Sequence, residues 1–230
     1  MARNIEVVTF DCYGTLIDAA GGLGTFLYSL ARGCGEEYPP PGFVLVARFA
    51  EAQADALHDQ VEGFDAVLDT ALRTVATERR WRLEAGDVEW LVQAMGSWQP
   101  FAESRLALRY VQGYGLRSGL VANCSRRIMA HTLHQLDIGF DAVVLSEDCG
   151  AYKPAPSVFE ALFDKLGADP HRVLHVSGSF ESDIPVAQEL GCMTAWINRG
   201  GKEDPGEPAP TYEWQSLRGL IELAALSQRD

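Results

Sequence analysis

The chain lacks any long apolar run. Its 230 residues are 47% hydrophobic, but the hydrophobic residues come in short runs broken by charges, and none approaches the roughly 20 apolar residues of a membrane-spanning helix. Residues 1–6 lead into a short apolar strand, without the longer apolar region or the small-residue cleavage site of a signal peptide. We therefore expect a protein of the cytoplasm that has no membrane partner.

Cysteine, histidine and positive charge are also scarce. The five cysteines form no C-x-x-C pair and cannot all close into disulfides, so reduced thiols are expected. The five histidines are scattered, and no group of Cys and His has the spacing of a zinc site. A total of 19 Lys and Arg against 32 Asp and Glu gives a net charge of −13, which repels nucleic acid at long range. We therefore expect no nucleic-acid partner.

Short apolar strands alternate with amphipathic helices over the second half of the chain. The periodicity predicts strands at 116–122, 141–145, 172–177 and 192–197, and helices at 104–113, 126–136, 156–166 and 183–190. Strands separated by single helices predict right-handed crossovers and a mainly parallel sheet. The expected fold is an α/β, doubly wound (Rossmann-like) parallel-sheet core.

An all-helical stretch interrupts this pattern after the first strand. Residues 5–10 are rich in β-branched residues and read as a buried strand, whereas helical periodicity follows over 24–33, 43–58, 64–80 and 87–95. We interpret residues 19–97 as a helical cap domain inserted into a core made of residues 1–18 and 98–230.

Polar residues follow the predicted strands where a parallel sheet would place a binding crevice. These loops hold Asp11 to Thr15, Asn123 to Ser125, Lys153, and Ser177 to Asp183. Ligands of such sheets bind outside the carboxyl ends of the strands, so we expect the loops to converge. A carboxylate there can act as a nucleophile and form an ester that water later hydrolyses, provided that a cation such as Lys153 offsets its charge.

The order of these motifs is similar to that of the haloacid dehalogenase-like superfamily. Phe10-Asp11-Cys12-Tyr13-Gly14-Thr15-Leu16 resembles its first motif, and Asn123 falls in the second. Residues 150–156 (Gly-Ala-Tyr-Lys-Pro-Ala-Pro) are similar to its lysine motif, and residues 177–183 occupy the fourth. Residues 196–199 (Trp-Ile-Asn-Arg) resemble the closing strand of the 2-haloacid dehalogenase branch. The resemblance covers nearly the whole chain.

This resemblance implies a hydrolase that attacks a small anionic, carboxylate-bearing substrate at carbon, of which 2-haloacid dehalogenase is the named example. Asp11 would be the nucleophile, Thr15 would orient it, and Lys153 would hold its charged form. Asp183 would position or activate the hydrolytic water. The implied substrate-binding residues are Tyr13, Asn123, Ser125, Ser177, Ser179 and a cap arginine. This arginine would bind the leaving halide, and Arg48 is preferred to Arg32 for it. Related enzymes often form homodimers, and such a pairing is compatible with this chain.

The alternative enzyme is a magnesium-dependent phosphatase of the same superfamily. There the resemblance calls for a second aspartate at position 13, which is Tyr13 here, and for an acidic pair at 178 and 183, of which only Asp183 is acidic. Magnesium prefers octahedral oxygen coordination, so a site reduced to Asp11 and Asp183 would bind it weakly. We therefore expect no cofactor.

Two departures from the dehalogenase pattern leave a third hypothesis open, a non-catalytic member that binds a ligand or a partner. Ala122 stands where the second motif has Ser or Thr, and Gly178-Ser179 stands where Ser-Asn is more usual. Loss of one hydroxyl donor to an oxyanion can cost about 3 kcal/mol, unless Cys124, Ser125 or a backbone amide replaces it.

Several of these residues also have plain structural explanations. Asp183, followed by Ile and Pro, is typical of a helix start, and capping is compatible with catalysis. Arg48 fits the solvated or salt-bridged face of a helix. His175, inside a predicted strand, is expected to be a packed or hydrogen-bonded core histidine and not a general base.

Overall fold

Apolar strands form one sheet in the computed structural model, which describes residues 5–59, 62–203 and 207–226. Every neighbouring pair of strands is parallel. This confirms the predicted α/β, doubly wound fold. The spatial order is β3 (Ala142–Leu145), β2 (Arg117–Ala122), β1 (Val7–Phe10), β4 (Val173–Ser177), β5 (Met193–Ile197) and β6 (Tyr212–Trp214).

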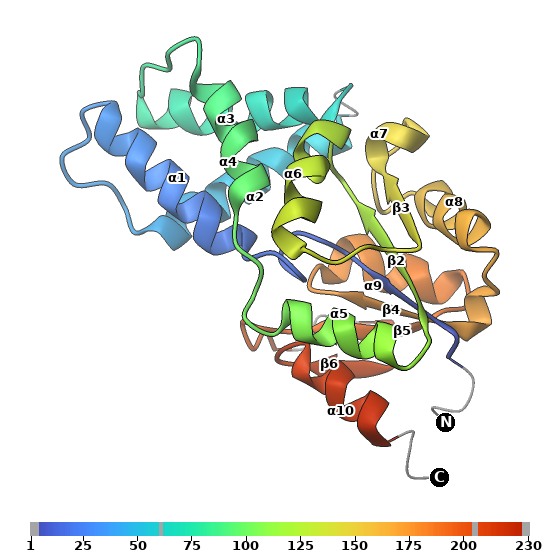
Figure 1. The fold of residues 1–230 in the computed structure, drawn as a ribbon. Coiled ribbons are helices and arrows are strands. Elements are labelled where there is room, and N and C mark those ends of the chain that lie inside the picture. The colour runs from blue at the N-terminus through green and yellow to red at the C-terminus, as the bar shows by residue number, and fades with distance from the viewer. Residues whose placement is uncertain (1–4, 60–61, 204–206, 227–230) are drawn as a thin grey trace. The chain divides into compact units, whose positions relative to one another are not determined.

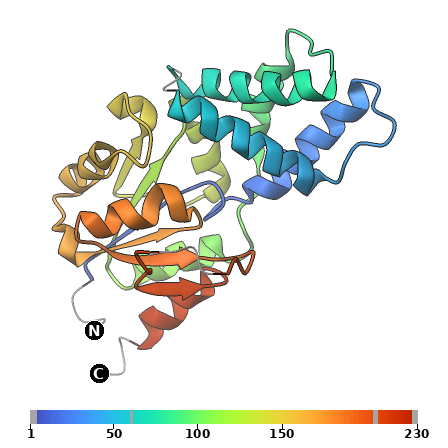
Figure 2. The ribbon, with the colours of Figure 1, turned by 180° about the vertical axis from the view of Figure 1, so that it is seen from behind.

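Helices cover both faces of this sheet, as the buried central strands require. Each residue of β1 and β4 is buried, which is typical of parallel strands covered on two sides. Helices α8 and α9 lie on one face, and α5 and α10 pack together on the other (Figures 1 and 2). The helices of this part are α5 (Ser104–Gly113), α7 (Ser146–Cys149), α8 (Pro156–Leu166), α9 (Phe180–Glu189) and α10 (Arg218–Leu226), with a 3-10 turn at Pro170–Arg172.

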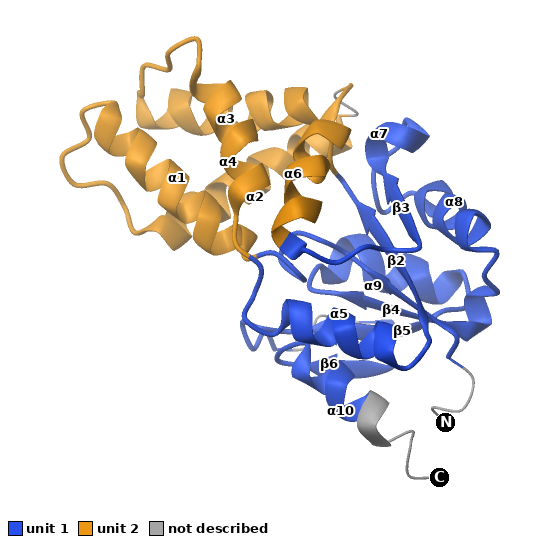
Figure 3. Cartoon of the chain, viewed as in Figure 1, with its two compact units in different colours: residues 1–17, 100–123, 136–230 blue, residues 18–99, 124–135 orange. Residues whose placement is uncertain are grey.

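The chain divides into two units, coloured separately in Figure 3. The first comprises residues 1–17, 100–123 and 136–230, and the second comprises 18–99 and 124–135. The chain passes into the second unit after residue 17 and back after residue 99, each within two residues of the boundary expected from the sequence. The difference is residues 124–135, which were expected in the core and which group with the helical unit.

Helices make up the second unit. They are α1 (Ala19–Gly33), α2 (Gly42–His58), α3 (Phe64–Arg79), α4 (Asp87–Ser97) and nearly all of α6 (Arg126–Leu136). Helix α1 begins earlier than predicted because the Asp18 carboxylate accepts a hydrogen bond from the Gly21 amide, 2.9 Å away, and caps the helix. Gly24 and Gly42 let α1 and α2 approach, since a Cβ on Gly42 would lie 3.3 Å from the Gly24 carbonyl oxygen. None of the helices in the described ranges is long and apolar enough to cross a membrane.

The first unit differs from the predictions at the start of α9, in the short helix α7, which was not predicted, and after β5. Helix α9 begins at Phe180, three residues before the predicted start, so Asp183 lies inside its first turn and does not cap it. Strand β6 and helix α10 follow the last predicted element and were not predicted. Strand β6 has three residues and none of them is buried, so it lacks the continuous apolar signal by which the other strands were found.

Candidate active site

Asp11 is the first residue after β1, and a tight loop follows it. The Asp11 amide donates to the Val176 carbonyl at the end of β4, which places the carboxylate at the carboxyl ends of the central strands. Gly14, with φ +90°, turns the loop so that its own amide donates to the Ile17 carbonyl, 2.8 Å away. A side chain is disfavoured at this φ, which explains a glycine three residues after Asp11.

Lys153 bridges two carboxylates. Its ammonium Nζ lies 2.8 Å from Oδ1 of Asp11, and 2.8 Å and 3.0 Å from the two oxygens of Asp183. All three side chains are buried. Burial alone would lower the pKa of Lys153, but attraction to Asp11 and Asp183 outweighs burial and raises that pKa above its usual range. The structure therefore brings together three of the four predicted catalytic residues around a permanent cation.

Asp183 is fully buried and saturated with hydrogen bonds. Besides Lys153, its Oδ1 faces Nε2 of His175 at 2.9 Å, and its Oδ2 accepts from the Ser182 hydroxyl. A carboxylate offers about four acceptor directions, and these contacts occupy them. Burial raises the pKa of Asp183, but the charge of Lys153 and the hydrogen bond from His175 outweigh it and lower the pKa to about 2. Such a carboxylate stays ionised and is a weak base.

The Thr15 hydroxyl donates a hydrogen bond to the Asp11 carboxylate. The Thr15 oxygen lies 2.7 Å from Oδ2 of Asp11 and 2.7 Å from the amide nitrogen of Gly178. The amide is a donor, so the oxygen accepts from Gly178 and its single proton is left for the carboxylate. Lys153 on Oδ1 and Thr15 on Oδ2 thus hold the Asp11 carboxylate in one orientation, as a positioned nucleophile requires.

Gly178 is explained by a close approach of two loops. A Cβ on Gly178 would lie 2.6 Å from the carbonyl oxygen of Gly14, a distance that real Cβ atoms essentially never show. The position that departs from both sequence patterns therefore has no room for a side chain unless the loop after β1 moves.

Asn123 clamps the lysine loop. Its Oδ1 accepts from the Lys153 amide at 2.7 Å, and its Nδ2 donates to the Lys153 carbonyl at 3.2 Å. Asn123 was predicted to bind substrate. In the structure its amide group positions the backbone of the lysine that holds Asp11.

A chain of serine hydroxyls leads from Asp183 towards the surface. The Ser182 hydroxyl has one proton, which it donates to the acceptor-only carboxylate of Asp183, so it accepts from the Ser179 hydroxyl 2.7 Å away. Ser179 is half-buried. Ser177 is buried and accepts from the Ser179 amide at 3.0 Å, which shapes this loop. Ser182 was not predicted, and its only sequence signal was a hydroxyl directly before Asp183.

Arg199, at the end of the Trp-Ile-Asn-Arg segment, supports the Thr15 loop. Its guanidinium carbon lies 3.5 Å from the centre of the Phe101 ring. One nitrogen donates to Oε1 of Glu103 at 2.7 Å, and another donates to the carbonyl of Thr15 at 3.0 Å. Sequence reasoning assigned Arg199 no role, because its partners lie about 100 or more residues earlier in the chain.

Tyr13 and Ser125 were also predicted to bind substrate, and they belong to different units. Tyr13 is half-buried in the loop after β1, where it forms a bridge with Ile17. Ser125 belongs to the second unit and is buried, and within the described part of the chain its hydroxyl has no hydrogen-bond partner. A buried, unsatisfied hydroxyl is costly.

Arg48, also in the second unit, is already paired. Its Nε donates to Oε2 of Glu78 at 2.8 Å, and Nη1 lies 3.2 Å from Oε2 of Glu51. This matches the salt-bridged helix face considered for Arg48 from the sequence. Arg32, the competing arginine, is exposed and donates to the backbone carbonyl of Glu37.

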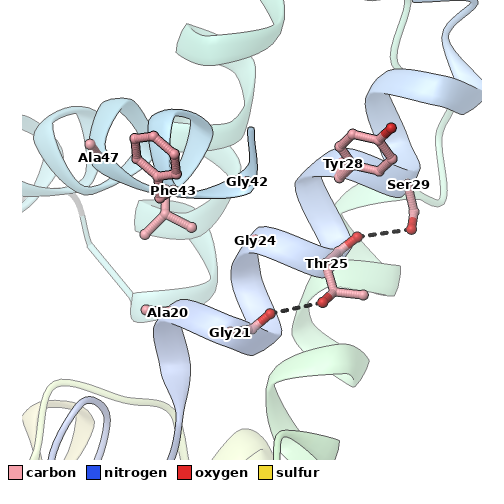
Figure 4. Close-up of a pocket in the computed structure, with 10 residues that line it drawn as sticks. Ala20, Gly21, Gly24, Thr25, Tyr28, Ser29, Gly42, Phe43 and Ala47 are labelled. Atoms are coloured by element: carbon pink, nitrogen blue, oxygen red, sulfur yellow. Dashed lines mark hydrogen bonds between the residues drawn. The ribbon is translucent and has the colours of Figure 1, made fainter. Parts of the chain in front are cut away.

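A hollow between α1 and α2 in the second unit is mainly apolar. Its volume is about 680 Å³, and Tyr28 of α1 and Phe43 of α2 are among the residues that line it (Figure 4). Among the residues that the structure describes, no charged side chain lines it. It therefore offers no counter-charge for an anionic substrate.

The residues around Asp11 do not fit a magnesium site. Tyr13 and Gly178 supply no carboxylate, and the oxygens of Asp183 are taken by Lys153, His175 and Ser182. Throughout the described ranges, no group of three or more His, Cys, Asp and Glu side chains could hold a metal ion. With the Asp183 oxygens engaged in this way, the side chains around Asp11 supply too few free carboxylate oxygens for the octahedral site that magnesium prefers.

Comparisons with known proteins place this geometry in a family. The haloacid dehalogenase-like hydrolase family model matches residues 5–191. The chain is 30% identical over 228 residues to an (S)-2-haloacid dehalogenase of Pseudomonas sp. (strain YL), covering 95% of this chain and 94% of that protein. It is 26% identical over 232 residues to haloacetate dehalogenase H-2 of Moraxella sp. (strain B), covering 97% and 100%.

A solved structure shares the fold. It is that of L-2-haloacid dehalogenase from Xanthobacter autotrophicus with chloropropionic acid covalently bound, 19% identical, with a TM-score of 0.81 over 96% of this chain and 98% of that chain. The family match, the full-length relatives and the shared fold agree with one another. The chain belongs to the haloacid dehalogenase-like hydrolase family.

Proposed function

We propose that this hydrolase cleaves the carbon–halogen bond of a small 2-haloacid, with Asp11 as its nucleophile. The observation that carries the proposal is the fixing of both Asp11 oxygens, Oδ1 by Lys153 and Oδ2 by Thr15, beside a position 13 that is not acidic. The names of the full-length relatives support the substrate class.

In the first step, an oxygen of Asp11 attacks the carbon that carries the halogen. A carbon–oxygen bond forms while the carbon–halogen bond breaks, and the halide leaves with the bonding electron pair. In the second step, water adds to the carbonyl carbon of this ester. The bond between that carbon and the substrate oxygen then breaks, which releases a hydroxy acid and a proton and regenerates the Asp11 carboxylate. Lys153 and Thr15 are placed to stabilise the negative charge that develops on the Asp11 oxygens.

Asp183 serves this reaction by holding Lys153. It is fully buried, and its low pKa makes it a poor acceptor for a proton from water. We therefore assign to Asp183 the positioning of Lys153, which replaces the water-activating role considered from the sequence. No step passes through a metal ion. The small anionic substrate belongs to this proposal, whereas the homodimer and the cytoplasmic location remain predictions from the sequence.

The test is halide release from a panel of 2-haloalkanoic acids, with and without magnesium, by the wild type and by Asp11→Asn. Asp164→Asn is the control, since Asp164 is an exposed residue of α8. We expect metal-independent turnover that Asp11→Asn abolishes and Asp164→Asn retains. A single turnover in oxygen-18 water should then place the label in the Asp11 side chain, because water attacks the ester carbonyl.

Other outcomes would overturn the proposal. Magnesium-dependent release of phosphate from a phosphomonoester, without halide release, would favour the phosphatase. Tight binding of a 2-haloacid with no turnover would favour a non-catalytic member.

A further inference from the structure

Thr9, His175 and Asp183 form a buried row of hydrogen-bonded side chains. Thr9 of β1 pairs in register with His175 of β4, and the Thr9 hydroxyl lies 2.9 Å from Nδ1 of His175. On the other side of the ring, Nε2 lies 2.9 Å from Oδ1 of Asp183. Both Thr9 and His175 are completely buried. The reaction proposed above uses neither of them.

The partners determine how the imidazole is protonated. Asp183 is ionised and can only accept, so Nε2 of His175 carries a proton. With that proton on Nε2, a neutral imidazole has an unprotonated Nδ1, which is placed to accept from the Thr9 hydroxyl. Phe159 presents a ring 5.3 Å away, nearly perpendicular to the imidazole, and so packs this side without offering a charge. Each donor in the row thereby meets an acceptor.

We propose that His175 is a positioning residue that acts through Asp183 on Lys153. The kinetic consequences of this role depend on the proposed function. Lysine has a long, flexible side chain, and Nζ of Lys153 is held by contacts with both oxygens of Asp183 and with Oδ1 of Asp11. Asp183 can orient Lys153 only while its own carboxylate is prevented from rotating. His175 fixes Oδ1 of that carboxylate, and Thr9 fixes the tautomer of His175.

Two substitutions of His175 separate this role from simple core packing. His175→Gln keeps a side-chain N–H able to reach Asp183, whereas the shorter His175→Asn places its amide near the former Nδ1 and loses that donor. Both replace a buried ring with a smaller polar side chain, so a purely structural role predicts similar losses of thermal stability and activity. We expect His175→Asn to lower kcat by about 10- to 100-fold, with little change in KM. His175→Gln should restore most of the loss.

Nuclear magnetic resonance gives a readout that does not depend on the reaction. Nitrogen-15 spectra of the wild type should show a protonated Nε2 and an unprotonated Nδ1 on His175. The ammonium signal of Lys153 should persist in His175→Gln and be displaced or broadened in His175→Asn. Thr9→Val should disturb the His175 signals, and Thr9→Ser should restore them.

The inference and the proposed function fail in different ways. If the wild type releases no halide from any 2-haloacid, the proposed function fails, and the Lys153 ammonium signal still decides the role of His175. Equal loss of kcat in His175→Gln and His175→Asn would overturn the positioning role. A Lys153 signal unchanged in His175→Asn, or a proton on Nδ1 in the wild type, would do so as well.

Discussion

The hydroxyl of Thr15 donates to Oδ2 of Asp11 over 2.7 Å, and the Gly178 amide fixes the direction of that donation. Thr15→Val removes the donor and leaves the Gly178 amide without its acceptor. A lost hydrogen bond to a charged group is worth about 1.5–3 kcal/mol, or roughly 10- to 100-fold, and we expect a loss of that size in kcat/KM. Thr15→Ser keeps the hydroxyl and should stay close to the wild type. Equal activity of the two variants would contradict this role for Thr15.

Position 178 should tolerate no side chain. Gly178→Ala places a Cβ 2.6 Å from the Gly14 carbonyl oxygen, and forced overpacking costs about 1–3 kcal/mol. We expect a loss of that size in the free energy of unfolding, measured by urea denaturation. Gly113→Ala is the matched control, since a Cβ there would meet no atom of another described part of the chain within 4 Å.

An acidic residue introduced at position 178 should not create a magnesium site. Gly178→Asp meets the same carbonyl oxygen, so we expect destabilisation and no magnesium-dependent phosphatase activity. Appearance of that activity, measured with a generic phosphomonoester, would show that the Gly14 loop moves aside easily.

The buried Lys153 and Asp183 pair should make stability depend on pH at the acid end. The pKa of Asp183 is about 2 in the folded protein against an ordinary 3.8. Its stabilising contribution is therefore present above the ordinary pKa of 3.8 and is lost as the pH falls towards 2. The raised pKa of Lys153 matters only in alkaline solution. The stabilising contribution of Lys153 is complete below pH 10.5 and is lost only at higher pH.

Lys153→Met tests this coupling. It leaves two buried carboxylates without their cation, so we expect unfolding at neutral pH to become easier by about 3–5 kcal/mol. The difference from the wild type should shrink in acid, where the carboxylates are protonated. Lys165→Met, at an exposed lysine of α8, should show no such pH dependence. A deficit in Lys153→Met that is constant from pH 3 to 8 would contradict the coupling.

The salt bridges of Arg48 predict that it is not the halide ligand. Because Glu78 and Glu51 already compensate its charge, Arg48→Ala should leave KM and inhibition by product halide unchanged. Arg73→Ala, which removes a similar helix pair with Asp69, is the matched control. Weaker halide inhibition in Arg48→Ala alone would restore the hypothesis drawn from the sequence, and the same loss in Arg32→Ala would transfer it to Arg32.

The local pattern of apolar residues in the sequence was enough to predict most strands of the core. The four strands predicted from 116 onward begin one residue later than predicted and end where predicted, because buried parallel strands read as continuous apolar runs bounded by turns. The start of α9 was misplaced because Pro185, inside that helix, reads locally as a residue close to a helix start. The three-residue strand β6 carries no such signal.

The sequence by itself also determined which chemical groups the site contains. Asp11 directly follows β1, whereas Lys153 and Asp183 lie in the segments that come after β3 and β4. Parallel topology brings the ends of these strands together. Only the tertiary structure decided what each group does. The contact of His175 with Thr9, the clamp of Asn123 on Lys153 and the packing of Gly178 on Gly14 each join segments that are far apart in the chain. Such pairings depend on the register of the strands and the closeness of two loops, and no local pattern of residues encodes either of them.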